Sequence, residues 1–184
     1  MKTKTKKNKQ NKKRFTRKNF TSGEGMLTSV WGPSLWHFLH TISFNYPIKP
    51  SMEDRNNYRN FMKSLQCILP CKYCRTNYVN NIKSLPLQCS VFKSRDAFSR
   101  YVYKLHEHVN KMLGKTSNLS YTQVRDRYEH FRSRCNQKQN KTRKKRETGC
   151  VDPLHGRKSK CILHIVSNKS RKKSFKMDRN ITVH

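Results

Sequence analysis

The chain has 184 residues, 33% of them hydrophobic, and its 42 lysines and arginines against 10 acidic residues give a net charge of +32. This length excludes a large multidomain enzyme, and no stretch approaches the ~20 consecutive apolar residues of a transmembrane helix. Residues 1–25 carry ten basic residues and one acidic residue, residues 136–184 carry 15 and three, and 16 of the 19 aromatic residues lie between. The composition therefore predicts a folded domain over residues 26–135, between two basic tails.

Both tails are expected to lack a packed core. Residues 1–25 are predicted to be disordered and residues 136–184 mostly disordered, because their few apolar residues cannot offset the loss of backbone entropy. No apolar segment follows the first charges, so no secretory signal is expected, and a Lys- and Asn-rich start fits a mitochondrial presequence poorly. Two interpretations of the charge stay open: contact with nucleic acid, an acidic partner or an anionic membrane, or solvated tails from a coding bias.

Three helices are predicted between residues 33 and 82, because apolar residues recur there at helical spacing. Pro33 suits the first turn of the first helix, which ends at Tyr46-Pro47. Ser51 is expected to cap the second helix, which ends at Leu69-Pro70. A shorter third helix is expected to begin around Cys71 and to end near residue 82.

Two more helices are predicted further along the chain. Ser94 is expected to cap a fourth helix and Gly114 to end it, and a short fifth helix carries Val124 and Tyr128. Val91-Phe92 is the one segment with strand-like alternation. The sequence therefore predicts an all-α fold, a four-helix bundle plus a short fifth helix, with disordered basic tails.

The cysteine spacing singles out one pair. There are seven cysteines, and Cys71 and Cys74 form the C-x-x-C motif. That motif serves as a redox disulfide, as half of a metal site, or occurs by chance. A helix that starts at Cys71 would place the first sulfur near the partly positive helix N-terminus, which favours a thiolate. A metal site would need two further ligands, which Cys67 and Cys89 could supply. Otherwise Cys67 is expected in the core and Cys89 in a loop.

Aromatic, histidine and amide residues share faces of two predicted helices. They are Trp36 and His40 on the first helix and Tyr103, His106 and Asn110 on the fourth, with Lys115 at its end. Taken singly, each histidine is more typical of a core residue whose ring nitrogens are hydrogen-bonded, or of a surface residue. Together with the cysteine pair they suit a planar ring with phosphates, the kind of two-electron cofactor that a dithiol needs to reduce oxygen quickly.

Four separated motifs carry a resemblance to a known family. In order and spacing, about residues 27–132 resemble the Erv/Alr family of FAD-linked sulfhydryl oxidases, and residues 69–75 resemble its versions in large DNA viruses. The motifs are Trp31-Gly32-x3-Trp36-x3-His40, then Tyr46-Pro47, then Pro70-Cys71-x2-Cys74, then His106-x2-Val109-Asn110-x4-Lys115.

The resemblance implies a cone-shaped helical bundle that binds FAD noncovalently, usually as a homodimer, and oxidises protein thiols to disulfides while oxygen becomes hydrogen peroxide. It implies that Cys71 exchanges with substrate thiols and that Cys74 lies beside the flavin. The positions implied to bind FAD are Trp31, Gly32, Trp36, His40, Tyr46, Tyr103, His106, Val109, Asn110, Lys115 and Tyr128. In this interpretation the protein holds no metal ion.

The chain departs from the family pattern in three ways. Pro33 stands where many members have a basic residue, and Glu107 stands where an Asn is usual. Tyr103 and Ser120 occupy the positions of a structural disulfide that many members have. The joint loss of both cysteines predicts that packing, and not a disulfide, anchors the last helix.

The resemblance also suggests partners and a compartment. Thiol-containing protein substrates or a thioredoxin-like relay are expected. Cys150 with Cys161, or Cys135, could form a second, shuttle disulfide, or all three could be free thiols. A viral source would imply the host cytoplasm or the virion, and another source an intracellular site, with the mitochondrial intermembrane space less expected. Two alternatives remain: a basic nucleic-acid-binding protein with a Cys-ligated zinc, and a scaffold that has lost oxidase activity.

Overall fold

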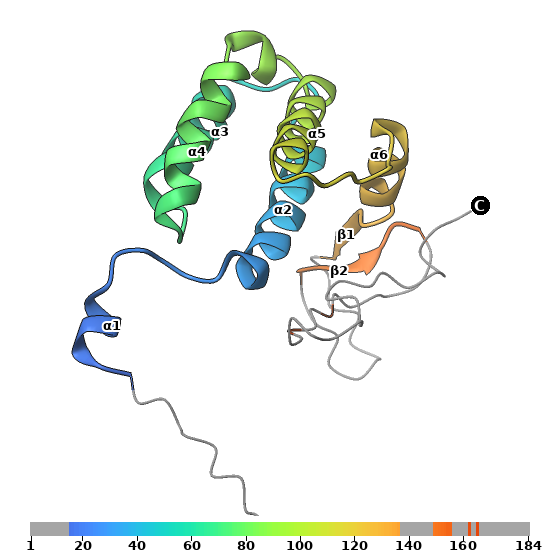
Figure 1. The fold of residues 1–184 in the computed structure, drawn as a ribbon. Helices are drawn as coiled ribbons and strands as arrows, with labels where there is room; N and C mark the ends of the chain where they lie inside the picture. Colours follow the sequence, from blue (N-terminus) through green and yellow to red (C-terminus); the bar gives the residue numbers. More distant parts are fainter. Residues whose placement is uncertain (1–14, 137–148, 156–161, 163–164, 166–184) are drawn as a thin grey trace, which may run out of the picture.

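The computed structural model describes residues 15–136, 149–155, 162 and 165. Its elements in chain order are α1 (Arg17–Thr21), α2 (Thr28–Asn45), α3 (Met52–Ile68), α4 (Lys72–Ser84), the short 3-10 helix η1 (Cys89–Phe92), α5 (Arg95–Met112), α6 (Tyr121–Glu129), β1 (Ser133–Asn136) and β2 (Gly149–Pro153). Helix α2 packs against α5 and α3 packs against α4, while α6 covers the far side of α2 and α5 (Figure 1). The prediction of a helical bundle with a short additional helix is confirmed.

Local capping signals set several helix ends, and those predicted at Ser51, Ser94 and Gly114 are confirmed. The Ser51 hydroxyl accepts the Asp54 N–H at the start of α3, and Ser94 and Ser120 cap α5 and α6 in the same way. Gly114, with φ +64°, follows the last turn of α5 in the left-handed conformation that favours glycine. Helix α2 differs, because it begins at Thr28 and contains Pro33 in its interior.

The core lies where α2, α3, α4 and α5 meet. Its fully buried side chains include Tyr46, Met62, Phe92, Phe98, Val102 and Leu105. The buried tyrosines satisfy their hydroxyls on backbone carbonyls: Tyr46 donates to Phe92 O at 2.8 Å and Tyr78 donates to Met62 O at 2.8 Å. These bonds tie chain segments together without leaving a buried polar group unpaired.

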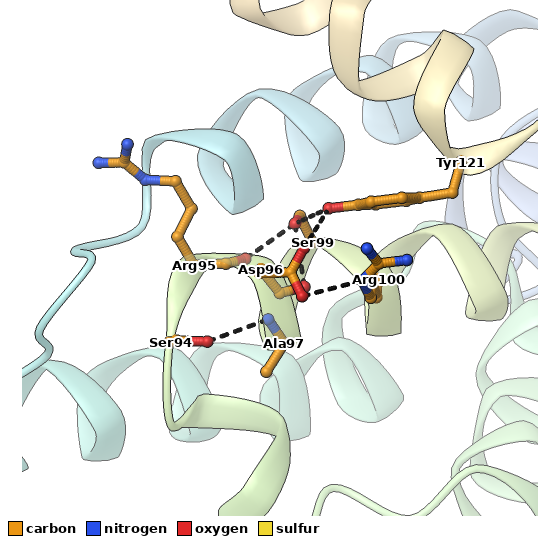
Figure 2. Close-up of polar contacts among 7 residues, drawn as sticks. All are labelled: Ser94, Arg95, Asp96, Ala97, Ser99, Arg100 and Tyr121. Atoms are coloured by element: carbon orange, nitrogen blue, oxygen red, sulfur yellow. Dashed lines mark hydrogen bonds and ion pairs between the residues drawn. The ribbon is translucent and has the colours of Figure 1, made fainter.

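Polar contacts hold α6 on α5 (Figure 2). The Tyr121 hydroxyl lies 2.8 Å from Ser99 Oγ, and the Arg100 guanidinium lies over the Tyr121 ring, 4.1 Å from its centre. Asp96 fixes Arg100 through a 2.8 Å ion pair. The anchoring contacts of α6 on α5 that the structure describes are therefore hydrogen bonds and ring contacts.

Tyr103 adds a further tie at the position of the family's structural disulfide. Its hydroxyl donates to the carbonyl of Leu119 at 2.8 Å, one residue before Ser120. A hydrogen bond to the backbone thus joins the first of the two disulfide positions to the residue that precedes the second.

The structure corrects three smaller expectations. Val91-Phe92 belong to the 3-10 helix η1 and not to a strand. Cys67 is exposed on α3 instead of lying in the core. Composition assigned residues 15–25 to a disordered tail, but they contain helix α1, and Gly25 forms an isolated β-bridge with Cys71. Residues 1–14 lie outside the described part of the chain.

A short strand pair also forms beyond the helices. Strands β1 and β2 pair antiparallel, with Ser133 opposite Pro153 and Asn136 opposite Gly149. The sequence indicated at most one short element after residue 136, so this pairing was not anticipated. The remainder of the expected C-terminal tail, apart from residues 149–155, 162 and 165, lies outside the described residues.

Candidate active site

The C-x-x-C pair lies at the N-terminus of α4. Leu69 and Pro70 end the preceding helical segment, and Cys71 is the N-cap residue of α4, with its sulfur accepting the Cys74 N–H at 3.2 Å. The predicted helix start at the first cysteine is confirmed. Hydrogen bonds from the Cys74 thiol, from backbone N–H groups and from the Thr28 hydroxyl lower the pKa of Cys71, which favours a thiolate at this sulfur.

Cys74 lies one turn further into the bundle and has a different environment. Burial raises the pKa of the Cys74 thiol, and its contact with Cys71 raises it further. The Thr28 hydroxyl lies 3.7 Å from Cys74 Sγ. The lowered pKa of Cys71 and the raised pKa of Cys74 are consistent with each other, because a reduced pair that loses one proton keeps the other on the more buried sulfur.

Three rings from α2 and α5 form the centre of the site. The Trp36 ring stacks on the His106 ring with centroids 4.0 Å apart and planes 6° apart. His40 Nε2 lies 3.0 Å from His106 Nδ1, so one nitrogen of this pair donates and the other accepts. The shared faces predicted for these two helices are therefore brought together.

Both histidines are neutral at physiological pH. Burial lowers the pKa of His40 to about 3, with the neighbouring His106 and His37 adding to the effect. Burial lowers the pKa of His106 to about 4, and the nearby Glu107 opposes that shift. A neutral imidazole donates a hydrogen bond at one nitrogen and accepts one at the other, so each histidine can pair with a donor or an acceptor of an uncharged ligand.

Polar and basic groups line the end of the site nearest α6. The Tyr128 hydroxyl oxygen lies 3.2 Å from His37 Nδ1. Asn110 Nδ2 donates to Glu107 Oε1 at 3.2 Å, so the departure from the usual family Asn leaves a carboxylate bonded to a neighbouring amide. Lys115 lies three residues beyond the last residue of α5, and its N–H donates to Asn110 O at 2.8 Å.

These groups surround one cavity of about 770 Å³. Its lining contains both cysteines and ten of the eleven residues expected to bind the cofactor, namely Trp31, Gly32, Trp36, His40, Tyr103, His106, Val109, Asn110, Lys115 and Tyr128. Tyr46 is the exception, because its side chain is fully buried in the core and bonded to Phe92 O. The expectation that Tyr46 binds the cofactor is therefore corrected, because its ring packs in the core of the bundle.

Several lining residues escaped the sequence analysis. They include Thr28, His37, Asn77, Asn81, Leu119 and Arg127. His37 follows Trp36 directly and therefore shows no i, i+4 relation to it, and its contact with Tyr128 depends on how α6 packs. Thr28 precedes the expected start of the first helix, so no local signal marks it.

Of the candidate shuttle cysteines, only Cys150 has a side chain that the structure describes, and it lies outside the cavity lining. Cys150 is exposed in β2 and is disulfide-bonded. The side chain of Cys135 and all of Cys161 lie outside the described residues. The free-thiol alternative is therefore wrong for Cys150.

The zinc alternative needs a cluster of ligands. Within residues 15–136, 149–155, 162 and 165, no three His, Cys, Asp or Glu side chains gather to hold a metal ion. Cys67 and Cys89, the two suggested additional ligands, are exposed free thiols.

Comparison with known proteins identifies the family. The model of the Erv1/Alr family matches residues 33–129, more than half of the chain. The chain belongs to this family. The Erv1/Alr match begins inside α2 and ends with α6, so it includes both cysteines and both central histidines but not the residues before Pro33.

Individual relatives agree with the family assignment. An Acanthamoeba polyphaga mimivirus protein named "Probable FAD-linked sulfhydryl oxidase R368" is 36% identical over 90 residues, 49% of this chain and 63% of the relative. The FAD-linked sulfhydryl oxidase ERV1 of Arabidopsis thaliana is 32% identical over 84 residues, 46% of this chain and 42% of the relative. The chain thus spans less than two thirds of either Erv1/Alr relative.

A solved structure supports the same fold. The crystal structure of the FAD binding domain of Erv1 from Saccharomyces cerevisiae matches with a TM-score of 0.51 at 25% identity, covering 56% of this chain and 94% of that one. Each helix that the present structure describes is too short or too polar to cross a bilayer.

Proposed function

We propose that this chain is an FAD-dependent sulfhydryl oxidase, which forms disulfides in protein thiols and uses oxygen as the acceptor, with release of hydrogen peroxide. The observation that carries the proposal is that Cys71 and Cys74 line the same cavity as the stacked Trp36 and His106 rings. A dithiol beside a ring-lined cavity is the arrangement that a flavin-linked thiol oxidation needs.

The residues present suit FAD. The cavity volume of about 770 Å³ falls within the range of about 300–1,000 Å³ that is typical of small-molecule sites. Among the described residues, Nδ1 of the buried His40 has no hydrogen-bond partner, although it lines this cavity. A buried polar atom without a partner is destabilising, so a ligand that bonds to it would stabilise the site.

Two groups of lining residues suit two different parts of FAD. The Trp31, Trp36 and His106 rings offer flat faces for an aromatic ring system. Lys115 and Arg127 offer the positive charge that phosphates require. Bound here, FAD would accept two electrons from the reduced cysteine pair and pass them to oxygen.

The two cysteines have separate tasks in this proposal. A substrate thiolate attacks Cys71 Sγ of the oxidised pair, and Cys74 leaves as a thiolate. A second substrate thiolate then attacks the mixed disulfide, so the substrate disulfide forms and Cys71 leaves as a thiolate. The N–H groups at the start of α4 stabilise the negative charge on Cys71, and the deeper position of Cys74 keeps it from competing for substrate.

Substitution of the inner cysteine tests the proposal. Cys74→Ser should keep FAD bound but abolish thiol-dependent oxygen consumption and peroxide release, because the pair can no longer be oxidised. Cys67→Ser, at an exposed thiol on α3, is the matched control and should keep the wild-type rate. Dithiothreitol oxidation by Cys74→Ser at the wild-type rate would contradict the proposal, and absence of peroxide from the intact protein would favour the inactive-scaffold alternative.

A homodimer is part of the same proposal. Phe38 on α2 packs edge-on against Phe61 on α3 and leaves half of its surface exposed. A second copy of the chain would cover this apolar surface. Light scattering should give the mass of a dimer for the wild type and of a monomer for Phe38→Glu.

A relay through Cys150 is also proposed. Cys150 is disulfide-bonded and exposed in β2, outside the cavity lining, where a protein substrate can reach it. Cys150→Ser should slow oxidation of a protein dithiol such as reduced thioredoxin without slowing oxidation of dithiothreitol. If Cys150→Ser lowered the oxidation rates of the protein dithiol and of dithiothreitol equally, a relay would be excluded.

The basic segments suggest a location and an accessory contact. Ten of residues 1–25 are basic, so we propose salt-dependent, sequence-independent contact with nucleic acid or an acidic surface. The mimivirus relative favours a viral source, for which the host cytoplasm or the virion is the proposed location. Binding to heparin that persists at 1 M NaCl would contradict an electrostatic contact.

A further inference from the structure

A segment before the Erv1/Alr match is joined to the cysteine pair by its backbone. Residues 24–28, here called the N-terminal strap, run antiparallel to the chain at Cys71. The Met26 N–H donates to Pro70 O at 2.6 Å, and the Lys72 N–H donates to Glu24 O at 2.8 Å. The strap therefore holds the turn that presents Cys71.

Glycine is required at the centre of the strap. Gly25 has φ +115°, and a Cβ there would lie 2.5 Å from Pro70 O and 2.6 Å from Cys71 Cα. Any side chain would push the strap away from the turn. Trp31 also holds the strap, because its ring N–H donates to Met26 O at 3.1 Å.

The strap ends at Thr28, the first residue of α2, whose hydroxyl lies 3.7 Å from Cys74 Sγ. Three groups act on this sulfur: the Cys71 thiol, the Thr28 hydroxyl and the N–H of Cys74 itself. Burial and Cys71 both raise the pKa of Cys74, whereas Thr28 lowers it. A hydroxyl that donates to a sulfur favours its thiolate form.

We propose that the N-terminal strap is a positioning element of the redox site: Gly25 fixes the turn at Cys71, and the Thr28 hydroxyl donates a hydrogen bond to the Cys74 thiolate. The role in turnover rests on the proposed oxidase function. The hydrogen bond itself concerns only thiol chemistry, so it can be measured without turnover.

The test measures the reactivity of Cys74 in full-length protein that carries Cys71→Ser. Iodoacetamide labels the thiolate, and peptide mass spectrometry separates Cys74 from the other cysteines. Thr28→Val keeps the shape of the side chain but removes the donor, and should slow labelling at pH 7 about threefold to tenfold and move the pH profile upward. Thr28→Ser should restore the rate.

Thr76→Val is the matched control. Thr76 lies on the same helix as Cys74, but its hydroxyl donates to Lys72 O. The control should label at the unsubstituted rate. If Thr28→Val also labels at that rate, or if Thr76→Val slows labelling equally, the proposed hydrogen bond is contradicted.

The strap is tested through Gly25. Gly25→Ala should speed hydrogen exchange of the Met26 and Lys72 amides about tenfold or more, because both bonds of the bridge are lost. In that background Thr28→Val should have less than a twofold effect on labelling, since the hydroxyl has already moved. Gly23→Ala is the control, because a Cβ at Gly23 meets nothing within 4 Å. Circular dichroism verifies that each variant is folded.

Failure of this inference can be told from failure of the proposed function. A full Thr28→Val effect in Gly25→Ala, or unchanged amide exchange, overturns the strap whether or not the protein binds flavin. A protein that binds no flavin but shows the predicted labelling changes supports the strap and overturns the oxidase function.

Discussion

His40 and His106 face each other across the interface of α2 and α5, with 3.0 Å between Nε2 of the first and Nδ1 of the second. Such a contact requires that at least one imidazole be neutral, because two protonated rings would present N–H to N–H. Burial favours the neutral form of both, and the proximity of His106 adds to this effect at His40. The pair therefore makes the stability of the site depend on pH.

The first prediction concerns that dependence. Both histidines have folded-state pKa values of about 3 and about 4, below their ordinary value of 6.5. Between pH 6.5 and 4 the unfolded chain binds more protons, so stability is complete above pH 6.5 and falls as the pH falls. The expected slope is about 1.4 kcal/mol per pH unit for each histidine.

Urea unfolding followed by tryptophan fluorescence between pH 5 and 7.5 measures this slope. His106→Gln should reduce it, whereas His108→Gln, on the same helix but outside the cavity lining, should not. Stability that stays constant from pH 7 to 5 would show that the buried pair does not resist protonation.

The second prediction concerns the anchor of α6. Tyr121→Phe removes the hydroxyl that contacts Ser99 and Asp96, and should lower the free energy of unfolding by about 1 kcal/mol. Because α6 carries Arg127 and Tyr128 to the cavity, FAD should also bind more weakly. Tyr73→Phe, at a side chain that is 73% exposed, is the control for stability. An unfolding free energy equal in wild type and Tyr121→Phe would contradict the anchor.

The third prediction concerns the basic end of the cavity. Lys115→Gln should weaken FAD binding about threefold to tenfold at low salt, because an attraction to phosphate is lost. The difference should shrink at 0.5 M NaCl, where exposed charges are screened. Lys111→Gln, one turn earlier and outside the cavity lining, is the matched control. A loss that persists undiminished at high salt would argue against a charge effect.

Helix ends were predictable where the signal is local. Ser51, Ser94 and Ser120 cap helices through residues three positions further on, and Gly114 ends α5 through its own backbone conformation. The cavity faces were predictable for the same reason, since His40 lies one helical turn after Trp36. Cys67 shows the limit: it lies two positions after the buried Leu65, which turns it off the apolar face of α3.

Features that depend on distant contacts were missed. Tyr46 lies beside the site in sequence, but whether it faces the cavity or the core is decided by the carbonyl of Phe92, 46 residues away. The N-terminal strap shows no hydrophobic pattern that would mark it in the sequence. It is held by backbone hydrogen bonds to Pro70 and Lys72, which form only when α4 is in place. Glycine at position 25 was visible in the sequence, but its reason is the close approach of Cys71.

The central claim is that the cysteine pair exchanges electrons with a flavin held between α2 and α5. The visible absorption spectrum of the purified full-length protein, recorded anaerobically before and after addition of dithiothreitol, tests it most directly. We predict a yellow protein whose flavin absorbance is lost on reduction in the wild type and in Cys67→Ser but persists in Cys74→Ser. A colourless protein that remains colourless after incubation with FAD, or equal bleaching of the Cys74→Ser variant, would contradict the account.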